Sequence, residues 1–255
     1  GGFFKDDVEY ASAAAAGLTG GDRTPLAASV NTKAGFSIIT WTNGTTTTPS
    51  SAKVAHGLTQ SPDFVIYKSR DNSSGQWNVK SEAFSNPVRT ELYLDSSGSA
   101  HTAGVDLWYR DSNYIGHRET SYGSNNDKIV AYCWHDVPGL QKFGSYEGNG
   151  SADGTFVELG FRPAVVIVKY AGTTGSASWF IYDSARGTFN PNNASIMPDR
   201  ELAEQNAYDI DFLSNGFKLR YADSAGYTNF SARYIYAAWA ESPTVNLYGG
   251  QSNAR

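Results

Sequence analysis

The sequence contains few sulfur-containing residues, which limits the disulfides and metal sites that it can form. Its 255 residues include one cysteine and one methionine. The single cysteine, Cys133, excludes an internal disulfide framework and a cysteine-based zinc site. It stands inside an apolar, strand-like run. We therefore expect a small buried side chain at this position rather than a nucleophile.

Basic patches and membrane-length apolar segments are also missing. The chain has 20 Lys and Arg against 25 Asp and Glu, a net charge of −5, and its bases form no run. A protein that holds a phosphate backbone normally shows a basic stripe, so we expect no nucleic-acid partner. The apolar runs are too short to cross a bilayer, so we expect no membrane insertion.

Aromatic residues and turn formers are abundant instead. Tyr (16), Phe (13) and Trp (6) are numerous, and 26 residues are Gly. This composition favours strands and turns. Polar and apolar residues alternate in VDLWY (105–109) and YDIDF (208–212), as in half-buried strands, while FVIY (64–67) and AVVIV (164–168) are typical of central strands. No segment carries a sustained helical stripe, so we predict an all-β fold.

The second half of the chain repeats the first. Four pairs of segments match in the same order along the chain: 56–68 with 159–169, 74–80 with 176–182, 104–112 with 216–224, and 128–138 with 233–243. Several collinear matches indicate a tandem duplication. The third pair, GVDLWYRDS with GFKLRYADS, places Trp108 opposite Arg220.

The duplication divides the chain into two sandwich-like β units after a short N-terminal connector. We predict a connector or oligomer-contact segment at 1–34, a first repeat at 35–140, and a second repeat with a C-terminal tail at 141–255. The connector is built of small residues and is not expected to form a core. Two tryptophan pairs recur between the repeats, and each is expected to fill the same hole in its core: Trp77 with Trp179, and Trp134 with Trp239.

The repeated segments also carry a family resemblance. KFGSYEGNGSADG (142–154), WFIYDSARGTFNPNN (179–193) and YDIDFLSNGFKLR (208–220) are its most specific parts. Together with the paired segments they resemble the C-terminal repeated domain, of unknown function, of tail-fibre-like virion proteins from tailed, mainly marine, bacteriophages. The resemblance covers about 35–241. It implies a virion location, other virion subunits as partners and a homo-oligomer, with a trimer as one option. It implies no catalytic residue.

The clearest candidate for recognition is an unmatched tryptophan. If Val105, Leu107 and Tyr109 face inward, Trp108 faces outward, and an exposed Trp suits stacking on a sugar or anchoring a protein contact. The alternative is that a loop, the other repeat or a neighbouring subunit covers it. The full candidate binding set comprises Trp108, Arg110, Asp111, Asn113, Tyr114, Trp41 and Arg220.

Motifs for catalysis or metal binding are weak. The four histidines show no spacing typical of a metal site, and neither a GxSxG elbow nor a P-loop occurs. Asp209 and Asp211 are two residues apart on an expected strand and are candidates for a glycosidase pair, but ordinary solvent-facing charge is the simpler interpretation. GNGSADG (148–154) is better explained as a Gly-rich turn than as a calcium loop. We expect no cofactor and no metal.

Three functions follow, in descending order. The first is a non-enzymatic virion component, a tail-fibre or appendage domain that attaches to a host surface glycan or protein. The second is a decorating or cementing protein of the capsid or tail. The third is a polysaccharide depolymerase.

Overall fold

The computed structural model describes residues 2–241 and is almost entirely β. Its only helical pieces are two three-residue 3-10 turns, η1 (Pro49–Ser51) and η2 (Glu119–Ser121). The all-β prediction is therefore confirmed. Within the described range no helix has the length and apolar character needed to span a membrane. The C-terminal tail and Pro243 lie outside the described residues.

The chain forms two compact units whose boundaries differ from the expected ones. Unit one comprises the chain up to Glu91 together with Thr102–His135, and unit two comprises Leu92–His101 together with the chain from Asp136 onward. The expected boundary at 140 therefore lies close to the observed one at 135. Sequence patterns did not indicate that residues 92–101 belong to unit two.

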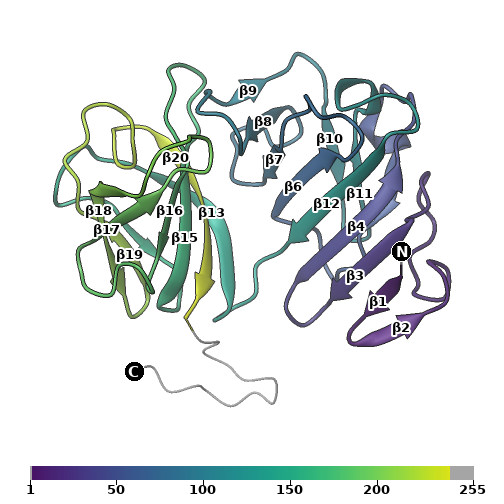
Figure 1. The fold of residues 1–255 in the computed structure, drawn as a ribbon, viewed down its shortest axis with the longest axis horizontal. Coiled ribbons are helices and arrows are strands. Elements are labelled where there is room, and N and C mark those ends of the chain that lie inside the picture. Colours follow the sequence, from purple (N-terminus) through teal and green to yellow (C-terminus); the bar gives the residue numbers. More distant parts are fainter. Residues whose placement is uncertain (1, 242–255) are drawn as a thin grey trace. The chain divides into compact units, whose positions relative to one another are not determined.

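Unit one contains most of a nine-stranded sheet and all of a three-stranded sheet. The larger sheet has the order β2-β1-β3-β4-β12-β6-β7-β8-β9, and the smaller one β10-β11-β5. Figure 1 shows β4, β12 and β6 side by side, as their antiparallel registers require. The strand bounds are β1 Phe3–Lys5, β2 Val8–Tyr10, β3 Ala27–Asn31, β4 Phe36–Thr42, β5 Lys53–Ala55, β6 Phe64–Ser69, β7 Asn78–Ser81, β8 Thr90–Tyr93, β9 His101–Thr102, β10 Trp108–Arg110, β11 Tyr114–His117 and β12 Lys128–Trp134.

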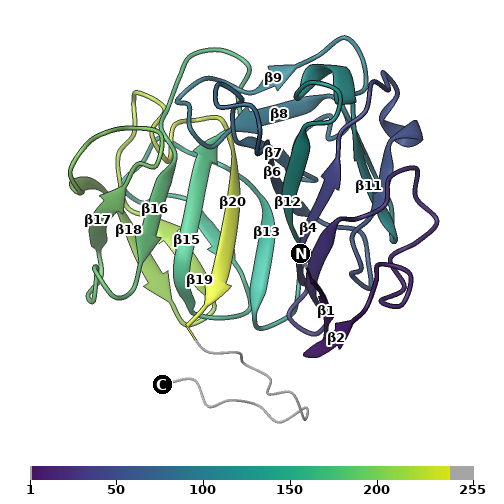
Figure 2. The ribbon, with the colours of Figure 1, turned by 45° about the vertical axis from the view of Figure 1, so that its right-hand side comes forward.

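Unit two is built on a single eight-stranded sheet. Its order is β13-β20-β15-β16-β17-β18-β19-β14, and a bulge interrupts the pairing of β17 with β18. Figure 2 shows β13, β20, β15 and β16 side by side. The strand bounds are β13 Gln141–Glu147, β14 Phe156–Glu158, β15 Pro163–Tyr170, β16 Phe180–Asp183, β17 Asn192–Ile196, β18 Gln205–Leu213, β19 Gly216–Leu219 and β20 Arg233–Ala240.

The two units repeat one strand order. The run β4-β12-β6-β7-β8 corresponds to β13-β20-β15-β16-β17, and the meander β10-β11-β5 corresponds to β18-β19-β14. Trp134 pairs with Phe36 and Phe64, while Trp239 pairs with Gln141 and Val165, so the two tryptophans hold equivalent positions. The duplication inferred from the sequence is thus a duplication of structure.

The meander corrects one of the sequence matches. Trp108 pairs with His117 in unit one, and Ile210 pairs with Leu219 in unit two. Trp108 is therefore equivalent to Ile210, not to Arg220. A turn common to the two units explains the shift, because DSNYIGHR (111–118) aligns with LSNGFKLR (213–220) around a shared Ser-Asn. The match of 104–112 with 216–224 was wrong by one strand.

Trp134 and Trp239, one of the two recurring pairs, do not fill the cores. Core residues of β12 are Ile129, Ala131 and Cys133, so the half-buried Trp134 faces the other side of its sheet. Trp239 has the same relation to Ala238 in β20. Because successive side chains of a strand point to opposite faces of the sheet, each Trp lies on the face opposite the core. For Trp134 and Trp239 the expectation that they plug the cores was therefore wrong. Of the other recurring pair, Trp179 is fully buried in unit two and Trp77 is half-buried in unit one.

The segment expected to be a connector contributes to the core of unit one. Its strands β1, β2 and β3 extend the nine-stranded sheet, and Ala13, Ala16 and Leu18 are buried in the core. Small side chains lie here because the chain packs closely against the unit. The prediction of a connector at 1–34 was therefore wrong. It was based on the inability of this segment to form a core alone, but the segment joins the core of unit one instead.

Residues 92–101 are held by buried polar groups of unit two. Trp179 is 1% exposed, and its Nε1 donates to the carbonyl of Tyr93 at 2.8 Å. Lys169, which is also buried, donates from Nζ to the carbonyl of Gly98 at 2.9 Å. Burial lowers the pKa of Lys169 to about 8. These contacts give Trp179 and Lys169, which both recur between the repeats, a structural role.

Candidate functional site

Unit one contains an open groove of about 400 Å³. This volume lies within the range of small-molecule sites. Three segments and one arginine form it: the loop after β4, the chain beside Val88, the approach to β10, and Arg118. The lining residues are Thr47, Thr48, Pro49, Ser50, Val88, Arg89, Gly104, Val105, Asp106, Trp108, Tyr109 and Arg118.

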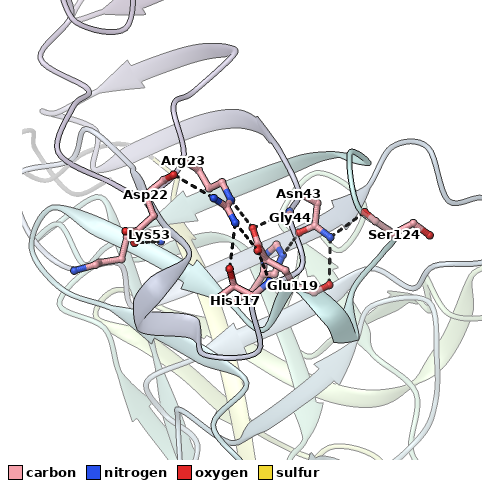
Figure 3. A network of polar contacts seen from close by, with 9 residues as sticks. Asp22, Arg23, Asn43, Gly44, Lys53, His117, Glu119 and Ser124 are labelled. Carbon is pink, nitrogen blue, oxygen red and sulfur yellow. Dashed lines mark hydrogen bonds and ion pairs between the residues drawn. The ribbon is translucent and has the colours of Figure 1, made fainter.

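An ion pair with a fully buried carboxylate fixes the loop that forms the first wall. Figure 3 shows the Glu119 carboxylate at the centre of this network. Arg23 grips it with two parallel hydrogen bonds, Nε to Oε1 at 2.6 Å and Nη2 to Oε2 at 2.7 Å. The backbone N–H groups of Gly44 and Thr46 donate to the same carboxylate at 2.9 and 2.8 Å. The wall is therefore rigid before any ligand arrives.

The electrostatics of Glu119 follow from these contacts. Its side chain is fully buried, and burial by itself raises a carboxyl pKa. The hydrogen bonds from Arg23 and Thr46 outweigh burial and lower the pKa of Glu119 to about 2. The hydrogen bond to Glu119 likewise raises the pKa of Arg23. Both groups stay charged at neutral pH and neutralise each other.

The second wall is formed by the chain around Val88 and Val105. These two side chains are 40% and 47% exposed and give the groove an apolar strip. Arg89 and Asp106 form an exposed ion pair, with Nε 2.7 Å from Oδ1. Because Asp106 neutralises Arg89, this wall carries little net charge.

Stacked aromatic rings support the floor of the groove. Trp108 stacks on Tyr67 with ring centroids 5.3 Å apart, and Tyr67 stacks on His117 at 5.4 Å. His117 Nε2 lies 2.9 Å from Asn43 Oδ1, so this nitrogen carries the proton. Burial lowers the pKa of His117 to about 4, which keeps the ring neutral at physiological pH.

A second buried ion pair lies close to these rings. Lys80 Nζ is 3.0 Å from Glu91 Oε2, and the two side chains are 2% and 3% exposed. The hydroxyl of Tyr122 also donates to Glu91. Burial lowers the pKa of Lys80 to about 8, although Glu91 opposes the shift. The equivalent of Lys80 in unit two is Tyr182, so this charged pair is a feature of unit one.

Arg118 is the charged group of the groove that no acid neutralises. Its Nη1 donates to the carbonyl of Thr47 at 2.8 Å, which orients the guanidinium along the first wall. Among residues 2–241, no carboxylate lies within ion-pair distance of Arg118. A fork of N–H donors held in place and left without an anion is suited to a ligand carboxylate.

The two predicted tryptophans are buried rather than exposed. Trp41 is 1% and Trp108 3% exposed, so the prediction that Trp108 faces outward was wrong. The regular alternation assumed for 105–109 breaks before β10. Both Leu107 and Trp108 donate their N–H to the carbonyl of Val88, at 2.9 and 3.1 Å, so both consecutive side chains are buried. Trp108 still contributes to the groove, as its floor.

The other predicted residues of unit one hold a hairpin together. Arg110 donates to Ser61 Oγ and to the carbonyl of Pro62, both at 2.7 Å. Asp111 caps the turn by accepting from the N–H groups of Asn113 and Tyr114 at 2.8 and 2.7 Å. Asn113 is exposed, and the hydroxyl of Tyr114 donates to the carbonyl of Thr19 at 3.1 Å. None of these four lines the groove.

The remaining predicted residue, Arg220, belongs to unit two. There it lies 3.4 Å from Asp211 Oδ2 and 3.9 Å from Asp153 Oδ1. Sequence analysis missed Arg118, the arginine that does line the groove. The available signal was the shared Ser-Asn turn, which aligns Arg118 with Arg220 once it is used as the anchor.

The candidate calcium loop is occupied by its own hydrogen bonds. Asn229 Nδ2 donates to Asn149 Oδ1 at 3.1 Å and to the carbonyl of Ser151 at 2.7 Å. Asp153 is paired with Lys218 at 2.5 Å. Over the described range, no cluster of three or more His, Cys, Asp or Glu side chains is arranged to hold a metal.

Comparison with known proteins identifies a family and no activity. No curated protein matches the chain, and no solved structure matches it. One family model does match, over residues 10–243, and it is described as a domain of unknown function (DUF7483). This span covers most of both units and all three segments that form the groove. The chain therefore belongs to the DUF7483 family.

Proposed function

We propose that this domain is a non-enzymatic recognition module of a virion appendage, and that unit one binds an acidic glycan on the host surface. The observation that carries the proposal is Arg118, an oriented guanidinium without an acidic partner in a preformed groove. The virion setting rests on the sequence resemblance to tail-fibre-like proteins.

The groove has the chemistry of a sugar site. The hydroxyl groups of Thr47, Thr48 and Ser50 are placed along one wall and can exchange hydrogen bonds with sugar hydroxyls. The apolar strip of Val88 and Val105 on the other wall suits the C–H face of a pyranose ring. Arg118 supplies the contact that selects a carboxylate, as in a uronic or sialic acid.

An open, rigid groove fits weak binding that is multiplied by copy number. Repeated copies of a site raise avidity well above the affinity of one site. A homo-oligomeric appendage, a trimer for example, provides such copies and makes other virion subunits the structural partners. Binding rather than cleavage is favoured by the groove itself. Among residues 2–241, Asp106 is the only acid that lines it, and Asp106 is paired with Arg89.

The test is a binding screen with acidic and neutral oligosaccharides, followed by titration of each ligand found. We expect uronate- or sialate-containing ligands to bind the wild type and Arg118→Ala to weaken them about tenfold or more, since a hydrogen bond to a charged group contributes about 1.5–3 kcal/mol. Arg70→Ala is the matched control, because Arg70 is an exposed arginine of unit one outside the groove.

Three outcomes count against the proposal. If no acidic glycan binds, or if Arg118→Ala binds as tightly as Arg70→Ala, the groove is not the site. Release of shortened oligosaccharides by the wild type would show an enzyme and would return attention to Asp209 and Asp211.

A further inference from the structure

Unit two presents a cluster of tyrosines, Tyr208, Tyr221 and Tyr227, whose side chains are only partly buried. The ring centroids of Tyr208 and Tyr227 are 4.5 Å apart, and those of Tyr208 and Tyr221 are 5.1 Å apart. The rings of Tyr208 and Tyr221 meet nearly edge to face, at 83°. The cluster rests on the fully buried Phe180, whose ring lies 5.0 Å from that of Tyr208.

The backbone beneath Tyr208 is strained. Its φ is +64°, a left-handed conformation that is a true outlier for a bulky aromatic residue. Tyr208 lies in the bulge of β18, where the register against β17 shifts between Asn192 and Ala194. The hydroxyl of Tyr182 holds the carbonyl of Tyr208 at 2.7 Å. Strain of this kind and strand bulges concentrate at functional sites, where they re-aim a side chain.

The loop that carries the other two tyrosines is equally fixed. The buried carboxylate of Asp223 accepts five backbone hydrogen bonds, from the N–H groups of Ala225, Gly226, Thr228, Asn229 and Phe230. Asn229 Nδ2 donates to the carbonyl of Tyr221 at 3.1 Å. The positions of Tyr221 and Tyr227 are therefore set by backbone contacts, and a ligand would meet a platform that is already formed.

The two bases closest to Tyr221 in the chain are already paired with acids, which disfavours an acidic ligand. Arg220, which adjoins Tyr221 in the chain, is paired with Asp211 and faces Asp153, and Lys218 is paired with Asp153. Asp209 adjoins Tyr208, so three acids stand against two bases. Exposed Asn206 and partly exposed Asp209 offer hydrogen bonds to hydroxyl groups.

We infer that the cluster of Tyr208, Tyr221 and Tyr227 is a second binding site, for the apolar face of a neutral hexose ring. Aromatic platforms bind such faces by stacking, and the neighbouring amide and carboxylate select hydroxyls over charges. The site differs in chemistry from the groove of unit one and does not rest on the proposal for that groove.

The test is titration of the whole domain with neutral gluco-, galacto- and manno-oligosaccharides, followed by calorimetry and tyrosine fluorescence. We expect at least one of these series to bind and Tyr221→Ala to weaken it about tenfold, whereas Tyr221→Phe retains most of the affinity because the ring remains. Phe189→Ala is the matched control, since Phe189 is an 84%-exposed ring of unit two outside the cluster.

The two proposals fail separately. Arg118→Ala is expected to leave neutral-sugar binding unchanged, and Tyr221→Ala is expected to leave acidic-glycan binding unchanged. If none of the three neutral series binds, or if Tyr221→Ala binds as tightly as Phe189→Ala, the second site is overturned. A Tyr221→Phe variant as weak as Tyr221→Ala would show that the hydroxyl and not the ring matters, which also overturns stacking. The circular dichroism spectrum of each variant checks that it is folded.

Discussion

Arg118 and Arg220 occupy the same place in the two units. Each follows the middle strand of the three-stranded meander, and each donates its backbone N–H to the strand beside it. Arg118 N lies 2.9 Å from the carbonyl of Leu107, and Arg220 N lies 2.8 Å from the carbonyl of Asp209. Leu107 and Asp209 are themselves equivalent, since each immediately precedes one of the matched residues Trp108 and Ile210.

The surroundings of the two arginines have diverged. In unit one, Glu119 and Arg23 satisfy each other and hold the loop after β4, which leaves Arg118 without an acid. In unit two, Tyr221 stands where unit one has Glu119, and Asn229 holds the equivalent loop. Arg220 is neutralised by acids instead. Duplication followed by this divergence is a physical route to two ligand specificities on one fold.

The network at Glu119 is expected to stabilise unit one. Glu119→Gln places an NH2 group against the N–H donors that now bind the carboxylate, and it removes the charged partner of Arg23. We therefore expect the free energy of unfolding to fall by about 3 kcal/mol. Urea unfolding measures this change. Glu158→Gln makes the same substitution at an exposed position and is expected to stay within about 0.5 kcal/mol of wild type. Equal stabilities for the two variants would contradict the structural role of Glu119.

Lys80 and Glu91 are expected to be strongly coupled. Removal of either partner leaves a buried charge, so Lys80→Met and Glu91→Leu should each cost about 3–5 kcal/mol. The double variant removes both charges and should cost much less than the sum of the two. A double-mutant cycle by urea unfolding measures the coupling. Additive costs would show that the two charges do not depend on each other.

The stability of unit one is expected to fall in mild acid because of His117. The folded state holds the pKa of His117 at about 4, below the value of 6.5 expected when the chain unfolds. Between these pH values the imidazole is protonated in the unfolded chain but not in the folded one. The free energy of unfolding therefore falls as pH falls, by up to about 1.4 kcal/mol per pH unit, and this contribution levels off below pH 4. His56, whose pKa is also lowered to about 4 by burial, acts in the same direction.

Replacement of His117 tests this assignment. His117→Leu is a reasonable fit, because Leu219 occupies the equivalent position in unit two. The variant keeps His56, so the slope of stability against pH between 6 and 4.5 should be roughly halved. An unchanged slope would mean that other groups govern the acid response.

Cys133 is expected to report the opening of unit one alone. It is the only cysteine, it is fully buried in β12, and burial raises its pKa to about 12. A thiol reagent should therefore leave the native protein unmodified and label it at the rate at which unit one opens. The prediction is measured by mass spectrometry across a urea series. Fast labelling in native buffer would show that the strand is accessible.

Predictions from the sequence succeeded where one local pattern decides the outcome. Apolar runs such as KIVAYCW (128–134) and AVVIVK (164–169) form central strands because an apolar strand needs cover on both faces. The duplication was visible because several segments matched at once. The inert character predicted for Cys133 follows from the same apolar run, and its burial agrees.

Predictions failed where packing depends on distant residues. The inward orientation of Trp108 follows from two N–H groups sharing the carbonyl of Val88, a contact that strand alternation does not contain. The burial of Ala13 and Leu18 depends on strands that lie later in the chain. Arg118 is distinctive only because no acid lies within ion-pair distance of it in the folded structure. Sequence patterns do not show which charged residues are neighbours in space.

Binding of an acidic glycan at Arg118 is tested most directly by NMR. Arginine side chains and backbone amides are labelled, and the protein is titrated with an acidic oligosaccharide. We predict that the Arg118 guanidinium and the amides of Thr47, Val105 and Asp106 shift together and saturably, while Arg220 does not move. Shifts confined to other surfaces, or a response of Arg220 without Arg118, would contradict it.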